Sequence, residues 1–408
     1  MKMDKFILLN IVLCSSYVYA TPNFAREYSA DCSTCHTMIP TLNQTGKSFL
    51  RNGFRFSKED MPTLKKIITP NKNESRPIPF AVMLNGNYDT QKEEFQTKVK
   101  LYTGGTITKN LSFYGMSKQN FDSNGDSKQD LFSEESSKFY GQLNFDESKH
   151  VIRAGLISPL TQFGNIQKAF ADTGLKGHNS SNDNGGQKSQ GRDNSKEKYG
   201  EGRDNQNGRN NQGTKDSHYK TPLQNASIGN IKGVEYSYLT DKNLMLLLSY
   251  GESIDKNNKN QSSYNNSLEN KDNYQFMGGV QYKTDSGYYL SLIYNQYENR
   301  GEDSFSMLLP IEKSFDSFQL ISTLVYRDET DREDNYYGVE NALIYSLSSR
   351  DYLRGVVDIG QEDNDESYGL SLTYSKAYKY ALFHITGARK STNEEDDNLI
   401  LGSISLLF

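Results

Sequence analysis

Two cysteines and a histidine near the N-terminus are the residues of this sequence best suited to chemistry. Two residues separate Cys32 from Cys35, and His36 follows directly. This C-x-x-C-H spacing is the attachment pattern of c-type haem, in which two thiols form thioethers to the vinyl groups and the imidazole ligates the iron. The spacing also brings both sulfurs and the imidazole to one face of a helical turn. We therefore predict one covalent haem c, attached through Cys32 and Cys35, with His36 as the proximal iron ligand.

Other uses of a C-x-x-C pair fit this sequence less well. A thioredoxin-like site needs a βαβ surround, and a zinc site needs a second pair of Cys or His ligands nearby. The mature sequence offers neither. For the second axial position of the haem iron, Met61 and Met83 are the possible distal ligands, and packing of these side chains on the porphyrin is the alternative. Met38 lies too close to His36 to reach the opposite haem face.

The elements that must position these residues begin with an export signal. An apolar run over residues 6–19 follows two lysines and ends at Ala20, which predicts a signal peptide over residues 1–20 and a mature N-terminus at Thr21. Cys14 lies inside this run, and the bulky leucine before it disfavours lipid attachment. After cleavage only the C-x-x-C pair remains, so no disulfide framework is expected.

Composition excludes several protein classes. The 46 Lys and Arg against 51 Asp and Glu lack the basic excess of a nucleic-acid-binding protein. Aromatic residues make up 12% of the chain, which is unlike a disordered protein, and the sequence has no repeated apolar runs long enough for membrane helices. From residue 78 onwards, apolar and polar residues alternate, as in Tyr368–Tyr374. Tyrosines bracket the apolar faces, as in the aromatic girdles of transmembrane barrels.

We therefore predict an all-β transmembrane β-barrel of about sixteen antiparallel strands, with a soluble β-sandwich as the alternative. Short turns alternate with longer links, which places both termini on the periplasmic side of a bacterial outer membrane. The last strand ends in Phe408, which resembles the recognition signature of outer-membrane barrels. Pro310 makes the tenth strand the weakest, because it removes a ladder donor. The predicted strands are residues 78–88, 94–107, 110–120, 134–145, 149–158, 228–239, 243–252, 273–283, 286–297, 303–311, 316–327, 335–346, 351–360, 367–376, 379–389 and 398–408.

Polar segments complete the predicted barrel. Charged residues that alternate with apolar neighbours should line a hydrated lumen: Lys98, Lys100, Arg153, Glu340, Arg354 and Asp358. His384 is also expected on a strand, as a wall residue rather than a ligand. Residues 159–227 are predicted to form a long disordered extracellular loop, because they contain few large apolar side chains. Acidic loops near residues 328–334, 362–366 and 394–397 could concentrate ferrous iron, or bind divalent cations that bridge lipopolysaccharide.

The sequence around the C-x-x-C-H residues resembles a known family. The segment from Thr21 to His36, followed by Ile39 to Asn43, Gly46 and Asn52 to Phe54, resembles the fused monohaem cytochrome-porins of iron-oxidising bacteria. The pair Glu27 and Tyr28 departs from the Gln-Thr often found in that family. The resemblance implies a short α-helical or irregular monohaem cytochrome c segment ahead of the barrel, and it assigns the haem to Cys32, Cys35 and His36. It also implies electron uptake from extracellular Fe(II).

These observations predict an outer-membrane electron conduit. Its parts are a signal peptide over residues 1–20, a monohaem segment over 21–76 that plugs the lumen, and a barrel over 77–408. One haem is shorter than the apolar band of about 25 Å, so it should sit inside the barrel, between an extracellular donor and a periplasmic c-type cytochrome or other acceptor. Outer-membrane lipid surrounds the barrel, and no catalytic acid or base is expected. The alternatives are a solute porin with an accessory haem segment, and a non-iron donor such as a sulfur compound.

Overall fold

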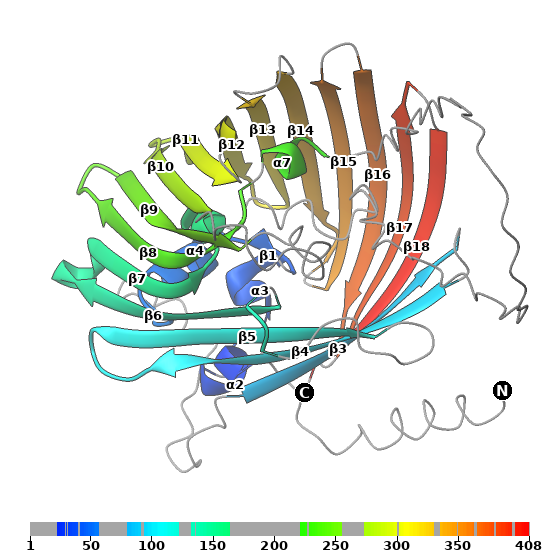
Figure 1. Cartoon of the computed structure of the whole chain (residues 1–408). Helices are drawn as coiled ribbons and strands as arrows, with labels where there is room; N and C mark the ends of the chain where they lie inside the picture. The colour runs from blue at the N-terminus through cyan, green and yellow to red at the C-terminus, as the bar shows by residue number, and fades with distance from the viewer. Residues whose placement is uncertain are drawn as a thin grey trace, which may run out of the picture.

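Among the residues that the structure describes, sixteen antiparallel strands form a closed barrel in the computed structural model (Figure 1). The sequence predicted this architecture, and each predicted strand overlaps an observed one. The strands are β3 (Phe80–Asp89), β4 (Glu94–Thr106), β5 (Leu111–Phe121), β6 (Ser137–Phe145), β7 (His150–Ile157), β8 (Asn230–Leu239), β9 (Leu244–Ile254), β10 (Tyr274–Lys283), β11 (Tyr288–Asn299), β12 (Glu302–Ser314), β13 (Phe318–Glu329), β14 (Tyr336–Ser346), β15 (Asp351–Glu362), β16 (Asp365–Ala377), β17 (Ala381–Thr392) and β18 (Asp396–Leu407). The described residues are 23–28, 30, 32–39, 41–56, 80–90, 94–121, 132–134, 136–163, 221–226, 228–254, 273–299, 302–329, 335–348, 350–362, 365–378, 381–393 and 396–407.

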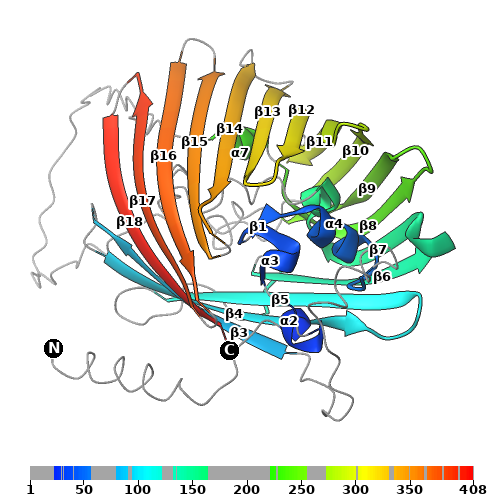
Figure 2. The ribbon, with the colours of Figure 1, turned by 180° about the vertical axis from the view of Figure 1, so that it is seen from behind.

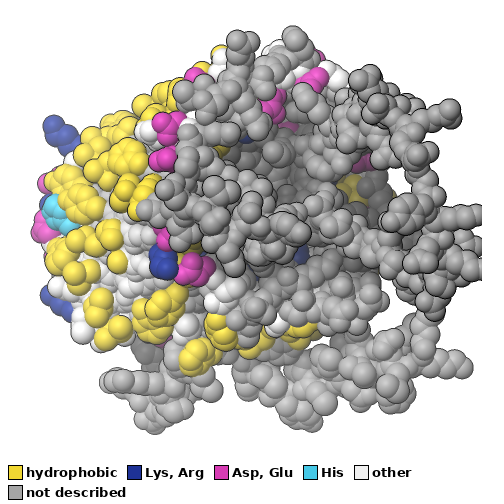
Figure 3. Space-filling view, in the orientation of Figure 1, with side chains coloured by type: hydrophobic (Ala, Val, Ile, Leu, Met, Phe, Trp, Pro, Cys, Tyr) yellow, Lys and Arg dark blue, Asp and Glu magenta, His cyan; other side chains and the backbone are white. Residues whose placement is uncertain are grey.

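The alternating sequence pattern sorts side chains between the two faces of the wall. Along β10, Tyr274, Phe276 and Tyr282 are 40%, 39% and 42% exposed, whereas the intervening Gln275 and Met277 are buried. Figure 3 shows the resulting apolar surface, which covers the outside of the barrel on the side of β7 to β10. An apolar exterior on a closed barrel is stable in lipid, because every strand finds its hydrogen-bond partners within the sheet.

Hydroxyl side chains stabilise the short turns at one end of the barrel. Thr108, Thr240, Thr284 and Ser348 each accept a hydrogen bond from a backbone N–H two to four residues later. Such side-chain bonds replace the missing ladder bonds where the chain reverses. The first strand begins and the last strand ends at this same end, which we call the short-turn end.

Strand β12 extends from Glu302 to Ser314, so it is longer than the predicted segment 303–311. Pro310 lies in its interior. The register between β11 and β12 passes from Leu290 opposite Ile311 to Ile293 opposite Leu308, so the ladder is interrupted beside the proline. On the other side, Pro310 lies opposite Thr323 in an unbroken register with β13. The interruption allows the strand to accommodate a residue without a backbone N–H.

Two groups of short elements lie against the inner wall. The first, which we call the N-terminal segment, contains α2 (Asn23–Tyr28), α3 (Cys32–Cys35), β1 (His36–Met38), β2 (Thr41–Leu42) and α4 (Gln44–Arg51). Both views place α3, β1 and α4 within the circle of strands (Figures 1 and 2). No described helix is long and apolar enough to span a membrane.

The second group comes from the two ends of the predicted loop 159–227. Its elements are η3 (Pro159–Phe163) and α7 (Pro222–Asn225), a 3-10 and an α-helical turn. Leu160, Phe163 and Leu223 are buried against inward apolar residues of the strands, including Met277 and Ile293. These ends therefore pack inside the barrel, and the rest of the predicted loop lies outside the described residues.

Candidate functional site

The C-x-x-C-H residues occupy one helical turn and the start of a short strand. Helix α3 runs from Cys32 to Cys35, and His36 begins β1. Residues three apart on a helix share one face. Strand β1 pairs antiparallel with β2, where His36 lies opposite Leu42. The side chains of Cys35 and His36 are half-buried, whereas the side chain of Cys32 lies outside the described part of the structure.

Asn43 joins α4 to this turn. Its Oδ1 accepts a hydrogen bond from the backbone N–H of Gly46 at 2.9 Å, which caps the N-terminus of α4. Its Nδ2 donates to the carbonyl oxygens of Ser33 and Thr34 at 3.1 and 3.2 Å. Its backbone N–H donates to the carbonyl oxygen of Cys35 at 3.0 Å. One residue therefore caps α4 and holds the carbonyl groups of α3.

Gly46 allows α4 to lie directly against the cysteine turn. A Cβ atom at this position would stand 2.1 Å from the carbonyl oxygen of Cys35 and 2.9 Å from Cδ2 of Leu42. Both distances are shorter than van der Waals contact, so only glycine fits without movement of α4. The positions of Asn43 and Gly46 explain why these residue types follow the C-x-x-C-H sequence.

The C-terminus of α4 ends in a Schellman turn. The N–H of Phe54 donates to the carbonyl of Phe49 at 2.9 Å, and the N–H of Gly53 donates to the carbonyl of Leu50 at 3.2 Å. Gly53 has φ of +66°, and an added Cβ would stand 2.7 Å from Oγ of Ser112 on β5. The turn therefore requires glycine and directs the chain along the barrel wall.

Polar contacts anchor α4 at the short-turn end of the lumen. Gln142 and Asn144 of β6 donate to the carbonyl oxygen of Arg51 at 2.9 and 2.7 Å. Lys47 forms an ion pair with Glu312 of β12 at 2.5 Å, and the two side chains are only 10% and 7% exposed. The helix is thus held by strands from different parts of the barrel.

Aromatic side chains pack between α2, α4 and the wall. We call this group the aromatic cluster; it comprises Phe24, Tyr28, Phe49, Phe54, Phe56, Tyr114 and Tyr140. Neighbouring ring centroids lie 4.7 to 6.1 Å apart, and Cys35 packs against the cluster. Tyr28 Oη donates to the carbonyl of Phe54 at 2.9 Å. Burial raises the pKa of Tyr28 to about 12, and the charge of Glu27 adds to the shift, so this donor stays protonated at neutral pH.

Two arginines and a glutamate are buried beside the aromatic cluster, and we call these three residues the arginine cluster. Arg153 of β7 and Glu235 of β8 form an ion pair in which Nε of Arg153 donates to Oε1 of Glu235 at 2.7 Å. The guanidinium carbon of Arg153 lies 5.1 Å from the ring centroid of Tyr140. These contacts join the cluster to the aromatic side chains.

Arg51 brings the second guanidinium from the last turn of α4. Its Nη1 donates to Oγ of Ser237 at 3.1 Å, and its Nη2 donates to the carbonyl of Lys149 at 2.8 Å. Burial lowers the pKa of Arg51 to about 10, and the charge of Arg153 lowers it further while Glu235 opposes the shift. Arg51 still carries a full positive charge at neutral pH.

The other predicted site residues occupy separate places. Met83 faces the lumen from β3, where Tyr102 Oη donates to its Sδ at 3.9 Å. Met61 and Phe408 lie outside the described residues. His384 is a wall residue, as expected: it is 7% exposed, and its Nδ1 lies 2.6 Å from Oγ of Ser375.

The predicted inward charges face the barrel interior. Arg153, Glu340, Arg354 and Asp358 are buried, and Lys98 and Lys100 lie across from Asn85 and Met83 on the same register. Within the described part of the chain, no group of three or more His, Cys, Asp or Glu side chains is placed to hold a metal ion. Several residues of the acidic loops lie outside the described ranges, namely Asp331, Glu333, Asp334, Asp363, Glu394 and Glu395.

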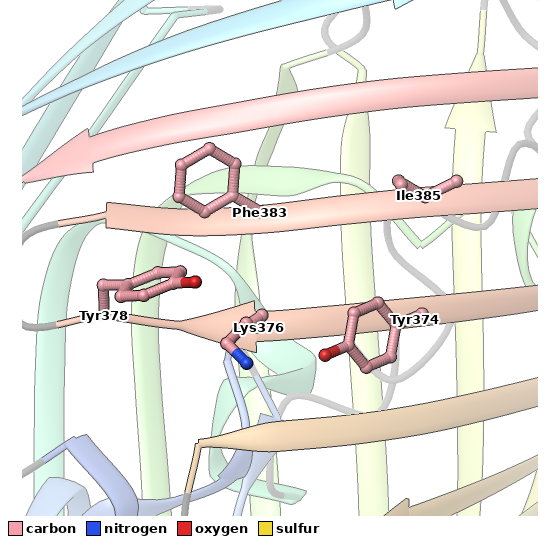
Figure 4. Close-up of a pocket in the computed structure, with 5 residues that line it drawn as sticks. All are labelled: Tyr374, Lys376, Tyr378, Phe383 and Ile385. Atoms are coloured by element: carbon pink, nitrogen blue, oxygen red, sulfur yellow. The ribbon is translucent and has the colours of Figure 1, made fainter.

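A recess of about 400 Å³ lies on the outer surface of the barrel, away from the cysteine turn. Its lining residues are Tyr374, Lys376, Tyr378, Phe383 and Ile385, which come from β16, β17 and the turn between them (Figure 4). Lys376 and Tyr374 both contact the carboxylate of Asp351, at 3.1 and 2.7 Å. The recess is therefore part of the exterior at the short-turn end, where tyrosine and lysine suit a membrane interface.

Solved structures share this architecture. The chain is similar to the anion-selective porin from Comamonas acidovorans, with a TM-score of 0.50 and 9% sequence identity over 81% of this chain and 98% of that chain. The fold is that of an outer-membrane porin. A loop-deletion mutant of OmpT, an outer-membrane protein of Vibrio cholerae, matches with a TM-score of 0.47 and 10% identity, and a triple mutant of the Rhodopseudomonas blastica porin with 0.42 and 14%. Both matches also cover 81% of this chain and 98% of the other chain. No protein-family model and no curated protein matches the sequence.

The porin-type barrel, with its apolar exterior, is an outer-membrane protein of a Gram-negative bacterium. The short-turn end corresponds to the periplasmic side, because both ends of the barrel sequence lie there. The N-terminal segment is therefore anchored at the periplasmic end of the lumen.

The sequence did not reveal the residues that attach the N-terminal segment to the porin-type barrel. Lys47 and Arg51 are four positions apart on α4, so they share the helix face that meets the wall. Their acidic partners, Glu312 and Glu235, are separated from them by more than 180 positions in sequence. The spacing of the two cations was the available signal, but sequence alone gave no means to locate the partners.

Proposed function

We propose that this protein holds one covalent haem c at the periplasmic end of its lumen and transfers electrons across the outer membrane. The observation that carries the proposal is the placement of the C-x-x-C-H residues. Cys32 and Cys35 lie on one turn of α3 that leads directly to His36. Helix α4 packs on this turn through Gly46 and is itself anchored to the barrel through Lys47.

The residues around α3 fit a c-type haem. Cys32 and Cys35 would form the thioethers, His36 would be the proximal ligand, and Met61 or Met83 are the proposed distal ligands. The aromatic cluster offers apolar rings against which a flat macrocycle can pack, and Cys35 already contacts this cluster. When bound, the haem would supply a one-electron Fe(III)/Fe(II) couple.

The barrel would position the C-x-x-C-H residues and give a donor access to them through the lumen. The wall around the N-terminal segment is polar, with side chains such as Gln142, Asn144 and Arg153 buried on its inner face. A polar lumen open to the outside would admit a small hydrated donor, and we propose Fe(II) as that donor. Anchoring of α4 at the periplasmic end would keep the C-x-x-C-H residues within reach of a periplasmic c-type cytochrome or other acceptor.

Haem attachment is tested first. The protein purified from outer membranes in detergent should give one haem per chain by pyridine haemochrome absorbance and a haem-stained band after denaturing electrophoresis. Cys35→Ser should abolish the stained band, whereas Cys14→Ser, in the predicted signal peptide, should retain it. A folded wild-type barrel without covalent haem would refute the proposal.

The donor is tested by absorption spectroscopy of the haem-loaded protein. Addition of Fe(II) at neutral pH should produce the reduced spectrum, and a periplasmic cytochrome should then reoxidise it. Reduction by sulfide but not by Fe(II) would replace iron with a sulfur compound as the donor.

Solute passage is the second candidate function, and the fold shared with porins favours it. Liposomes that contain an open barrel should swell in isotonic neutral sugars, and planar bilayers should show stepwise conductance. Swelling by a protein that lacks haem would establish a solute porin. A haem-loaded protein that passes no sugar would exclude this candidate.

A further inference from the structure

The arginine cluster carries an unbalanced positive charge inside the barrel. Arg153, Arg51 and Glu235 are 0%, 9% and 1% exposed. Among the described residues, Glu235 is the carboxylate whose charge acts on both guanidinium groups. Two cations therefore share one anion in a place where water cannot fully solvate them. Such an arrangement is strongly unfavourable unless a further negative group is bound.

Unsatisfied donors occur in the same cluster. Nε of Arg51 and Nη1 of Arg153 are buried and have no acceptor within the described part of the structure, and Oε2 of Glu235 is buried there without a donor. The other nitrogen atoms are occupied: those of Arg51 by Ser237 and Lys149, and those of Arg153 by Glu235. Glu235 alone therefore leaves donors of both arginines unpaired, and a second anion between them would supply the missing charge and an acceptor for these nitrogen atoms.

We propose that Arg51 and Arg153 bind a carboxylate that is carried on an apolar ring system. A guanidinium presents paired N–H groups that match the two oxygens of a carboxylate. The apolar part of such a ligand has an adjacent surface, because Tyr140 belongs to the aromatic cluster and also lies beside the Arg153 guanidinium. The aromatic surface continues from Tyr140 to Tyr114 and on to Phe54, with successive ring centroids 5.5 and 5.8 Å apart.

This carboxylate has two possible sources, a haem propionate or a free carboxylate solute in the lumen. The first source rests on the proposed function. Gly46 contacts the Cys35 backbone, and Arg51 follows five residues later, about 7.5 Å further along α4. The arginines thus lie toward the opposite end of α4 from the cysteine turn. A haem carries its vinyl groups and its propionates on different edges, so this separation suits a propionate.

The sources are separated by comparing haem-loaded and haem-free protein. Acetate at constant ionic strength is the probe, and thermal unfolding in detergent is the readout. In the Cys32→Ser/Cys35→Ser variant, acetate should raise the unfolding temperature in a saturable way, because the site is vacated. Arg51→Gln in that background should abolish the rise. The matched control Arg55→Gln should keep it, since Arg55 bonds backbone carbonyls at the exposed end of the segment.

The haem-loaded wild type should show no rise with acetate, because a propionate already occupies the arginines. In this form Arg51→Gln should shift the reduction potential to more negative values, since a positive charge near the iron favours Fe(II). Arg55→Gln should shift it less. Stabilisation of a wild type that carries no haem would refute the proposed function and leave a free carboxylate as the ligand.

Glu235→Gln distinguishes a binding site from a purely structural arginine pair. This variant keeps both arginines and removes their counter-charge, so it should bind acetate several-fold more tightly in the haem-free background. A structural role alone predicts no gain in affinity. The proposal is overturned if acetate stabilises no haem-free form and Arg51→Gln leaves the reduction potential unchanged.

Discussion

Replacement of Gly46 by alanine tests whether contact between α4 and the cysteine turn holds the N-terminal segment in place. The added Cβ would stand 2.1 Å from the carbonyl oxygen of Cys35, so α4 must retreat by about 1 Å or more to reach ordinary contact. Overpacking of this kind costs about 1–3 kcal/mol. The retreat also stretches the bond from the Asn43 N–H to Cys35, worth about 1 kcal/mol. The higher helix propensity of alanine offsets about 1 kcal/mol, which leaves a net local loss of about 1–3 kcal/mol.

Amide hydrogen exchange of α4 in the folded, detergent-solubilised barrel measures this loss. A loss of about 1–3 kcal/mol corresponds to exchange that is roughly 5-fold to 150-fold faster. Amides of the barrel strands should keep their wild-type rates, because their ladders do not depend on α4. Haem attachment to Cys35 should fall in parallel, since the turn that presents the thiol loses its support.

Gly387→Ala is the matched control, because a Cβ there would meet nothing within 4 Å on the exterior of β17. It should leave α4 exchange unchanged. If Gly46→Ala also exchanges at the wild-type rate, then α4 does not press on the cysteine turn and the reasoning is refuted.

Three further perturbations address the anchor, the pH response and the membrane face. Lys47→Met leaves Glu312 buried without its cation, at a cost of about 3–5 kcal/mol. Proteases should therefore cut the N-terminal segment faster than in the wild type. Adding Glu312→Gln should recover part of the resistance. Tyr28 has a pKa of about 12 in the folded protein against an ordinary value of 10. Its contribution to stability is therefore complete below pH 10 and is lost as the pH rises towards 12. Tyr28→Phe should remove this loss of protease resistance from a profile of proteolysis rate against pH. Leu372→Lys, at an outward position that is 59% exposed, should lower the unfolding free energy in vesicles by about 2–4 kcal/mol, and Tyr368→Lys near the strand end should lower it less.

The strands could be predicted because each one repeats the same local rule. Outward positions such as Leu370 and Leu372 face lipid and are apolar. The alternate inward positions, such as Ser371 and Thr373, face the lumen and are polar, so the sequence alternates with a period of two. Pro310 correctly marked a weak point, because the ladder with β11 is interrupted beside it, but the strand continues past the proline because its register with β13 is unbroken.

The interior was harder to predict because its contacts join distant parts of the sequence. The expectation of a polar inner face fails on β9, where Met245 and Leu247 face inward and pack with Phe163 of η3. The low average hydrophobicity of residues 159–227 concealed the few apolar residues at both ends of that stretch. The partners of α4 were equally hidden, since Lys47 meets Glu312 only after the barrel has closed.

The position of the N-terminal segment constrains the donor in the proposed function. The described contacts of α4 lie at the periplasmic end, through Glu312 on β12 and the Lys149 carbonyl beside a short turn. A single redox centre at that depth leaves most of a lipid-spanning band of about 25 Å between it and the outside. A donor must therefore enter the lumen, which favours a small hydrated ion over a mineral surface or a protein. The proposed mechanism then requires both solute access from outside and electron transfer to the periplasm, so a test of sugar passage and a test of haem reduction bear on the same proposal.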